Sequence, residues 1–169
     1  PADPATLTVN DWYTLMSYES ALLVLSMNGP QIKEVLERGY RNYWYYKYDP
    51  AHGGYSYYTT CMLTTDAGNQ ITYEDPGAGT PPDGDNVLSL TLNGNPVDFS
   101  DADTYYSVST VNYLAAGSCN FNNAGETIWP LDQIEHDTQY YVRDSVISYV
   151  TAQSLISPAV EGRLQFVAP

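Results

Sequence analysis

The sequence has few positively charged residues. Its 169 residues include 6 Lys and Arg against 20 Asp and Glu, which gives a formal net charge of −14 at pH 7. A surface that follows the phosphates of a nucleic acid, or that binds an anionic membrane, needs clustered cations. The composition therefore argues against nucleic acids and anionic membranes as partners, and the acidity favours solubility outside the cell.

Histidine is also scarce. The sequence contains two, His52 and His136, and neither has a second His or a Cys at the spacing of a metal site. No Gly-x-Ser-x-Gly segment marks a serine nucleophile, and no Gly-rich loop with a Lys marks a phosphate-binding loop. We therefore expect no catalytic residue, no metal ligand and no cofactor in this chain.

Long apolar runs are absent as well. No stretch approaches the 18 residues of a membrane span. The chain opens at Pro1 with no Met and no signal peptide, which is typical of a mature product or an excised domain. A hydrophobic content of 43% excludes a disordered chain. We expect a linker or extended arm at 1–6 and one domain at 7–169.

The two cysteines, Cys61 and Cys119, form an even pair. Few lysines and 17 tyrosines indicate a secreted or extracellular-surface protein, and in such a compartment the two thiols are expected to form a disulfide. Two buried thiols remain the alternative.

Hydrophobic periodicity predicts both helices and strands. Helices are expected at 11–16, after an Asn10 cap, at 31–40 and at 131–155, and the aromatic-rich segment 40–48 is expected to be extended. Strands are expected at 21–27, 55–64, 70–73, 87–92, 104–114 and 161–167. Because strands and helices do not strictly alternate, the pattern favours a single α+β domain.

Two acidic loops offer oxygen ligands for a hard cation. One contains Asp83, Asp85 and Asn86, and the segment 98–103 holds three further Asp residues. Calcium-dependent adhesion is one interpretation. The spacing of a known calcium loop is lacking, so solvated turns are favoured.

Residues 110–121 (TVNYLAAGSCNF) lead from a strand into small residues and a glycine, and end at Phe121 in a polar loop. An aromatic side chain presented in this way either fills the core or stacks on a flat ligand.

Three segments resemble the C-terminal domain of 5'-nucleotidases. They are ALLVLSMNGPQIKEVL at 21–36, NYLAAG at 112–117 and SPAVEGRLQF at 157–166. The resemblance implies a four-layer α/β/β/α fold and a nucleotide pocket in which two aromatic rings sandwich the base. It implies a separate metallophosphoesterase domain, with divalent metals, for the hydrolysis.

Carried over to this sequence, the resemblance implies base stacking by Tyr18 and Phe121. Glu126 is the nearest candidate for a ribose contact, with Asn120 and Asn122 as further polar contacts. The partner is then a purine nucleoside or nucleotide.

The sequence departs from the family at Gly117-Ser118-Cys119-Asn120, where the family has Gly-Gly-Asp-Gly, and the phosphate-binding arginines of the family lie mostly upstream of Pro1. Tyr18 and Phe121 are therefore either ligand-binding or retained packing residues. The second hypothesis is a structural module of an extracellular assembly that keeps the fold without the ligand and forms a homo-oligomer through the arm at 1–6.

Overall fold

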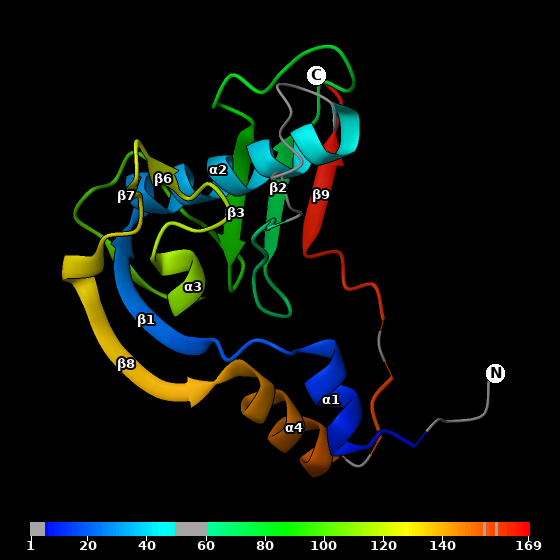
Figure 1. Cartoon of the computed structure of the whole chain (residues 1–169). Coiled ribbons are helices and arrows are strands. Elements are labelled where there is room, and N and C mark those ends of the chain that lie inside the picture. Colours follow the sequence, from blue (N-terminus) through cyan, green and yellow to red (C-terminus); the bar gives the residue numbers. More distant parts are fainter. Residues whose placement is uncertain (1–5, 50–60, 154, 158) are drawn as a thin grey trace.

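Figure 1 shows the computed structural model of the chain, which describes residues 6–49, 61–153, 155–157 and 159–169. Helices and strands are mixed in a single domain, which confirms the predicted α+β class. The helices are α1 (Val9–Leu15), α2 (Gly29–Tyr48), α3 (Asn112–Ala115) and α4 (Val142–Gln153), with a 3-10 turn, η2, at Leu131–Gln133.

The strands form two main sheets. The first has the order β5-β1-β8, with β5 at Tyr105–Val111, β1 at Ala21–Asn28 and β8 at Ile134–Tyr141, and both of its pairings are antiparallel. The second has the order β4-β3-β2-β9, with bounds Asn95–Pro96, Val87–Leu92, Gln70–Glu74 and Leu164–Val167, and β2 and β9 pair in parallel. A two-stranded ribbon joins β6 (Asn122–Asn123) and β7 (Glu126–Thr127).

Helix α1 begins earlier than predicted. Thr8 precedes the helix, and its backbone N–H donates to the Asp11 carboxylate at 2.7 Å. This contact lowers the pKa of Asp11. The capping residue is therefore Thr8 and not Asn10, because the Asp three residues later completes a capping box with Thr8.

Helix α2 is twice as long as predicted, and the expectation of an extended segment at 40–48 is wrong. The helix runs to Tyr48, and the N–H of Asp49 donates to the carbonyl of Tyr45 at 3.0 Å. Tyr40 and Trp44 are buried and continue the inward face of Ile32 and Leu36 at a spacing of four residues. Burial of these side chains at helical spacing outweighs the preference of aromatic residues for strands, so the segment is helical.

The helix predicted at 131–155 is wrong over its first half. Residues 134–141 form β8, which pairs with β1, and only Val142–Gln153 is helical. β8 is exposed over most of its length, so the positions of apolar residues in its sequence do not distinguish a strand from a helix. Partnership with a distant strand determines its conformation.

The predicted strand at 104–114 also ends early. The structure has β5 up to Val111, and then the short helix α3 from Asn112. The predicted strand at 55–64 lies largely outside the described residues, and 61–64 are not in a strand. Residues 1–5 of the predicted arm are likewise outside the described residues.

The core lies around α2 and the two main sheets. Its largest buried side chains come from α2 (Tyr40), from β2 (Tyr73), from β1 (Leu25, Met27) and from the loop before β6 (Phe121). At the far end of the molecule, α1 packs on α4 (Figure 1). None of the helices in the described part of the chain has the length and apolar character needed to cross a membrane.

Candidate functional site

A cavity of about 660 Å³ opens where the turn between α1 and β1 meets α3. This volume is within the range of small-molecule sites, about 300–1,000 Å³. Its described lining consists of two tyrosines, three small or polar side chains, one carboxylate and a pair of cysteines: Tyr18, Tyr113, Ser20, Asn112, Ala116, Glu19, Cys61 and Cys119.

The pairing of β1 with β5 brings the two tyrosines to this cavity. Tyr18 lies in the turn just before β1, and Tyr113 lies in α3, just after β5. Asn112 joins the two sides, because its Oδ1 accepts a hydrogen bond from the N–H of Ala21 at 3.1 Å. The side chain of Tyr18 is 86% exposed and that of Tyr113 is 56% exposed, so both present ring surface to solvent.

A disulfide forms another part of the wall. Cys61 and Cys119 are bonded across a separation of 58 residues, which confirms the predicted pairing. Cys119 has a φ of 54°, a left-handed conformation that is uncommon outside glycine. The loop therefore turns sharply at the residue that carries the bond.

Helix α2 holds the loop that follows Cys119. Nη1 of Arg38 donates to the carbonyls of Asn120 and Asn122, each at 2.6 Å, and Nδ2 of Asn42 donates to the carbonyl of Cys119 at 2.6 Å. Hydrogen bonds from a guanidinium are stronger than those between neutral groups. The loop backbone is thus tied to α2 at three of its carbonyls.

Phe121, the predicted second stacking residue, is 0% exposed. Its ring packs against Trp129 with the ring centroids 5.7 Å apart. In this arrangement Phe121 is a core residue, and it does not line the cavity of Tyr18. Stacking by Phe121 stays a prediction, and it would require the ring to leave this packing.

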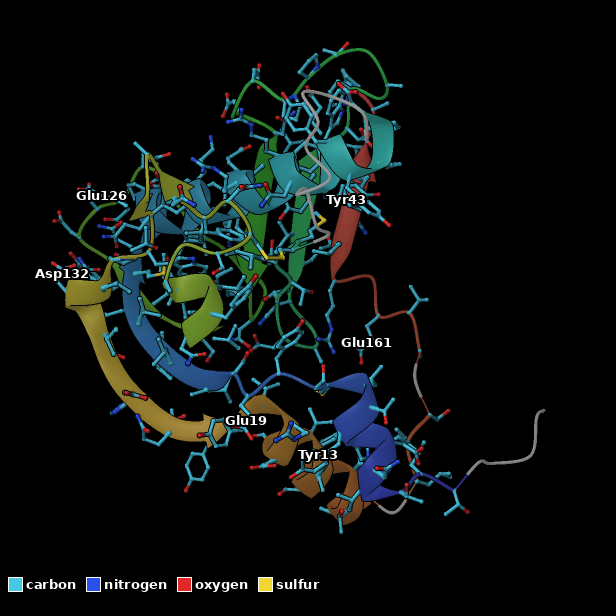
Figure 2. The ribbon with its side chains drawn as sticks, in the orientation of Figure 1. Tyr13, Glu19, Tyr43, Glu126, Asp132 and Glu161 are labelled. Carbon is cyan, nitrogen blue, oxygen red and sulfur yellow. A yellow bond between two sulfur atoms is a disulfide. The ribbon has the colours of Figure 1, made fainter. Side chains whose placement is uncertain are left out.

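The predicted polar contacts also lie apart from the cavity lining. The side chain of Asn122 bonds within its own loop, since Nδ2 donates to the carbonyl of Gly117 at 2.8 Å and Oδ1 accepts from the N–H of Gly125 at 3.2 Å. Glu126 is exposed on β7, in the two-stranded ribbon (Figure 2). Ribose contacts by Asn120, Asn122 and Glu126 therefore stay predictions.

Sequence reasoning missed Tyr113. The residue stands in the NYLAAG segment directly after Asn112, and it faces the cavity because the strand ends at Val111 and a helix begins. A continuous strand through Leu114 was predicted, and this hid the change of direction. The available signal was a large aromatic followed by small residues, which is typical of a turn at a ligand-binding surface.

All six cations of the chain lie in the described part, and none lines the cavity. Each contacts an acidic side chain, backbone carbonyls or an aromatic ring; the pairs are Lys33 with Asp85, Lys47 with Asp75, Arg143 with Glu19, Arg163 with Glu161, Arg38 with the carbonyls of its loop, and Arg41 with Tyr45. The described lining of the cavity therefore offers no Lys or Arg side chain to a phosphate group.

The acidic loops behave as turns. The carboxylate of Asp98 accepts from the hydroxyl and N–H of Ser100 at 2.7 and 2.8 Å, and that of Asp101 accepts from the N–H of Asp103 at 2.8 Å. The Ser100 hydroxyl lowers the pKa of Asp98, and hydrogen bonds from the Thr104 side chain and from the N–H of Asp103 lower the pKa of Asp101. Within the described residues no three His, Cys, Asp or Glu side chains approach one another as metal ligands would.

Comparison with known proteins identifies the domain. The family model described as "5'-nucleotidase, C-terminal domain" matches residues 1–126. Among solved structures, a 5'-nucleotidase precursor from Thermus thermophilus matches with 20% identity and a TM-score of 0.68, over 95% of this chain and 28% of that chain. The NAD nucleotidase of Haemophilus influenzae matches with 22% identity and a TM-score of 0.71, over 98% and 27%.

A putative 5'-nucleotidase from Staphylococcus aureus, in complex with alpha-ketoglutarate, matches with 16% identity and a TM-score of 0.67, over 96% of this chain and 30% of that chain. At these identities the similarity shows a shared fold. The chain spans less than a third of the length of these solved structures. A search of curated proteins finds no match.

Proposed function

Because the chain belongs to the family of 5'-nucleotidase C-terminal domains, we propose that it is the substrate-recognition domain of a 5'-nucleotidase-like hydrolase. In this proposal it binds the nucleoside part of a nucleotide in the cavity between Tyr18 and Tyr113. Hydrolysis belongs to a separate metallophosphoesterase domain that uses divalent metals. This chain contributes recognition and no catalytic residue.

The observation that carries the proposal is the pair of exposed tyrosines on one cavity. A flat ring that stacks on a protein aromatic gains about 1–3 kcal/mol. Tyr18 and Tyr113 supply two such surfaces, and Ser20 lies beside them with a hydroxyl that can donate or accept. The cavity is large enough for a base with part of its ribose.

The charge of the cavity limits the proposal to the nucleoside part. Phosphate groups in proteins are held by Arg, Lys, backbone N–H groups or metal ions. Since none of the six cations lines the cavity, the phosphate of a bound nucleotide would be held by another part of the parent protein.

The disulfide supports a location outside the cytoplasm. Such bonds form and persist in oxidising compartments. Cys61 and Cys119 form this bond in the wall of the cavity, so the binding surface itself depends on an oxidising environment. We place the parent protein among secreted or surface proteins on this ground.

Titration of the domain with adenosine, followed by tyrosine NMR signals, tests the proposal. We expect saturable shifts of Tyr18 and Tyr113, and a loss of affinity of about 1–3 kcal/mol in Tyr18→Ala and in Tyr113→Ala. Tyr149→Ala is the matched control, because Tyr149 is 62% exposed on α4 and does not line the cavity.

Absence of binding at millimolar adenosine, with both cavity variants equally silent, would overturn the proposal. Ring signals of Phe121 that shift as strongly as those of Tyr18 would instead support the Tyr18–Phe121 pair expected from the family resemblance. The two outcomes are distinguished within a single set of spectra.

A further inference from the structure

The cavity carries one formal charge on its described lining, and that charge is negative. It belongs to Glu19, whose side chain is 65% exposed beside Tyr18. Residues 50–60, which are not described, contain no Lys, Arg, Asp or Glu in the sequence. All six Lys and Arg side chains of the sequence lie outside the described lining, so none of them neutralises Glu19 from within the cavity.

Arg143 lies behind this carboxylate. Its side chain is 4% exposed, and Nη2 donates to Oε1 of Glu19 at 3.4 Å while Nη1 donates to the carbonyl of Met16 at 3.2 Å. Figure 2 shows Glu19 and Tyr13 at this end of the molecule, and the guanidinium of Arg143 stacks 3.8 Å from the centroid of the Tyr13 ring.

Arg143 therefore orients Glu19 without removing the negative charge of the region. Asp144 is a second acid, with Oδ1 4.0 Å from Nε of Arg143. Two carboxylates and one guanidinium leave a sum of one negative charge. No hydrogen bond of the described structure uses the second oxygen of Glu19, which leaves this oxygen open to a ligand.

The tyrosine rings add to this preference. The face of an aromatic ring carries a negative partial charge, so a cation above it is attracted more strongly than a neutral group. Tyr18 and Tyr113 both expose ring surface on the cavity that contains Glu19. The carboxylate and the ring faces thus both favour a positively charged ligand.

We propose that the cavity prefers a nucleoside whose base carries a positive charge over a neutral base of the same size. This inference rests on the proposed function, because it assumes that a base enters between the tyrosines. The ligand class comprises nucleosides of ring-alkylated purines. Exposed cation–ring contacts and exposed ion pairs each contribute modestly, so we expect a preference of about three- to tenfold.

Three ligands separate charge from size: adenosine, N6-methyladenosine, which is neutral, and 1-methyladenosine, which is a cation at neutral pH. We expect 1-methyladenosine to bind about three- to tenfold more tightly than N6-methyladenosine by NMR titration at low salt. Added salt should reduce this ratio, because it screens exposed charges.

Glu19→Gln should bring the ratio of the two affinities close to one, because it removes the negative charge of the described cavity lining. Glu34→Gln, an exposed carboxylate on α2 outside this cavity, is the matched control and should keep the ratio. Thermal melting of each variant shows whether it is folded.

Adenosine binding that is lost in Tyr18→Ala, with 1-methyladenosine no tighter than N6-methyladenosine, would overturn this inference and leave the proposed function standing. Failure of all three ligands to bind would overturn the proposed function, and the inference with it.

Discussion

At the scale of single residues, Asp75 connects the C-terminal end of α2 to the loop that follows β2. Its carboxylate accepts from the hydroxyl of Tyr48 at 2.9 Å, from Nζ of Lys47 at 3.2 Å and from the N–H of Gly77 at 3.0 Å. The hydroxyl of Tyr40 lies 3.3 Å away. Burial raises the pKa of Asp75, but these hydrogen bonds outweigh it and hold the pKa below its usual range.

Asp75→Asn should lower the free energy of unfolding by about 2–3 kcal/mol at neutral pH, because hydrogen bonds to a charged group are lost. The folded pKa is depressed, so the stabilisation by Asp75 is present above about pH 4 and is lost as pH falls through the folded pKa. The difference from wild type should therefore shrink in acid, as measured by urea unfolding across this range.

Asp132→Asn serves as the control, because Asp132 is exposed on η2 and its carboxylate makes no hydrogen bond within the described residues. A stability difference between Asp75→Asn and wild type that is equal at neutral and acid pH would contradict the role assigned to the ionised carboxylate.

At the scale of elements, the start of α2 determines how the helix sits against the rest of the molecule. Oδ1 of Asn28 accepts from the N–H of Gln31 at 3.2 Å, and Oε1 of Gln31 accepts from the N–H of Asn28 at 3.0 Å, which forms a capping box. Gly29 follows, and a Cβ on this residue would lie 2.1 Å from the carbonyl oxygen of Asp98. The helix therefore begins in close contact with the loop before β5.

Gly29→Ala should lower the free energy of unfolding by about 1–3 kcal/mol, because the backbone of Asp98 has to move. A loss of stability in Gly29→Ala is informative, since alanine is otherwise preferred to glycine in a helix by about 1 kcal/mol. Gly39→Ala is a milder control, because its nearest contact would be 3.3 Å, to the nitrogen of Leu63. Equal stability of Gly29→Ala and wild type in urea would contradict the close approach.

At the scale of the whole molecule, the disulfide connects the segment after residue 60 to the loop that α2 holds. It closes a loop of 58 residues and contributes to the wall of the cavity. A cross-link over a loop of this length stabilises a fold mainly by restricting the unfolded chain. Stability and the shape of the binding surface therefore depend on the same bond.

Replacement of both cysteines by serine should lower the free energy of unfolding by about 2–4 kcal/mol and weaken adenosine binding. Unfolding in urea with and without a reducing agent measures the effect. The reducing agent should destabilise the wild type and leave the Cys61→Ser/Cys119→Ser variant unchanged. Equal unfolding of wild type and variant under oxidising conditions would contradict a structural role for the bond.

Local sequence signals were sufficient where an element is buried or capped by its own residues. The apolar run at 21–27, the alternation at 87–92 and the turn at Asn93-Gly94 are all present in the structure as β1, β3 and the β3–β4 hairpin. They failed where the partner is distant. β8 is exposed and takes its conformation from β1, and α2 continues because Tyr40 and Trp44 fit a core built by other strands.

The sequence by itself determined the α+β class, the family and the scarcity of Lys and Arg, because composition and local motifs report these properties directly. It favoured a disulfide over two buried thiols, and the structure decided between them because it brings Cys61 to Cys119. Only the tertiary structure decided that Phe121 fills the core, since Arg38 and Asn42 hold its loop against α2. It also decided that Tyr113 shares a cavity with Tyr18, because strand pairing joins residues that are far apart in the chain.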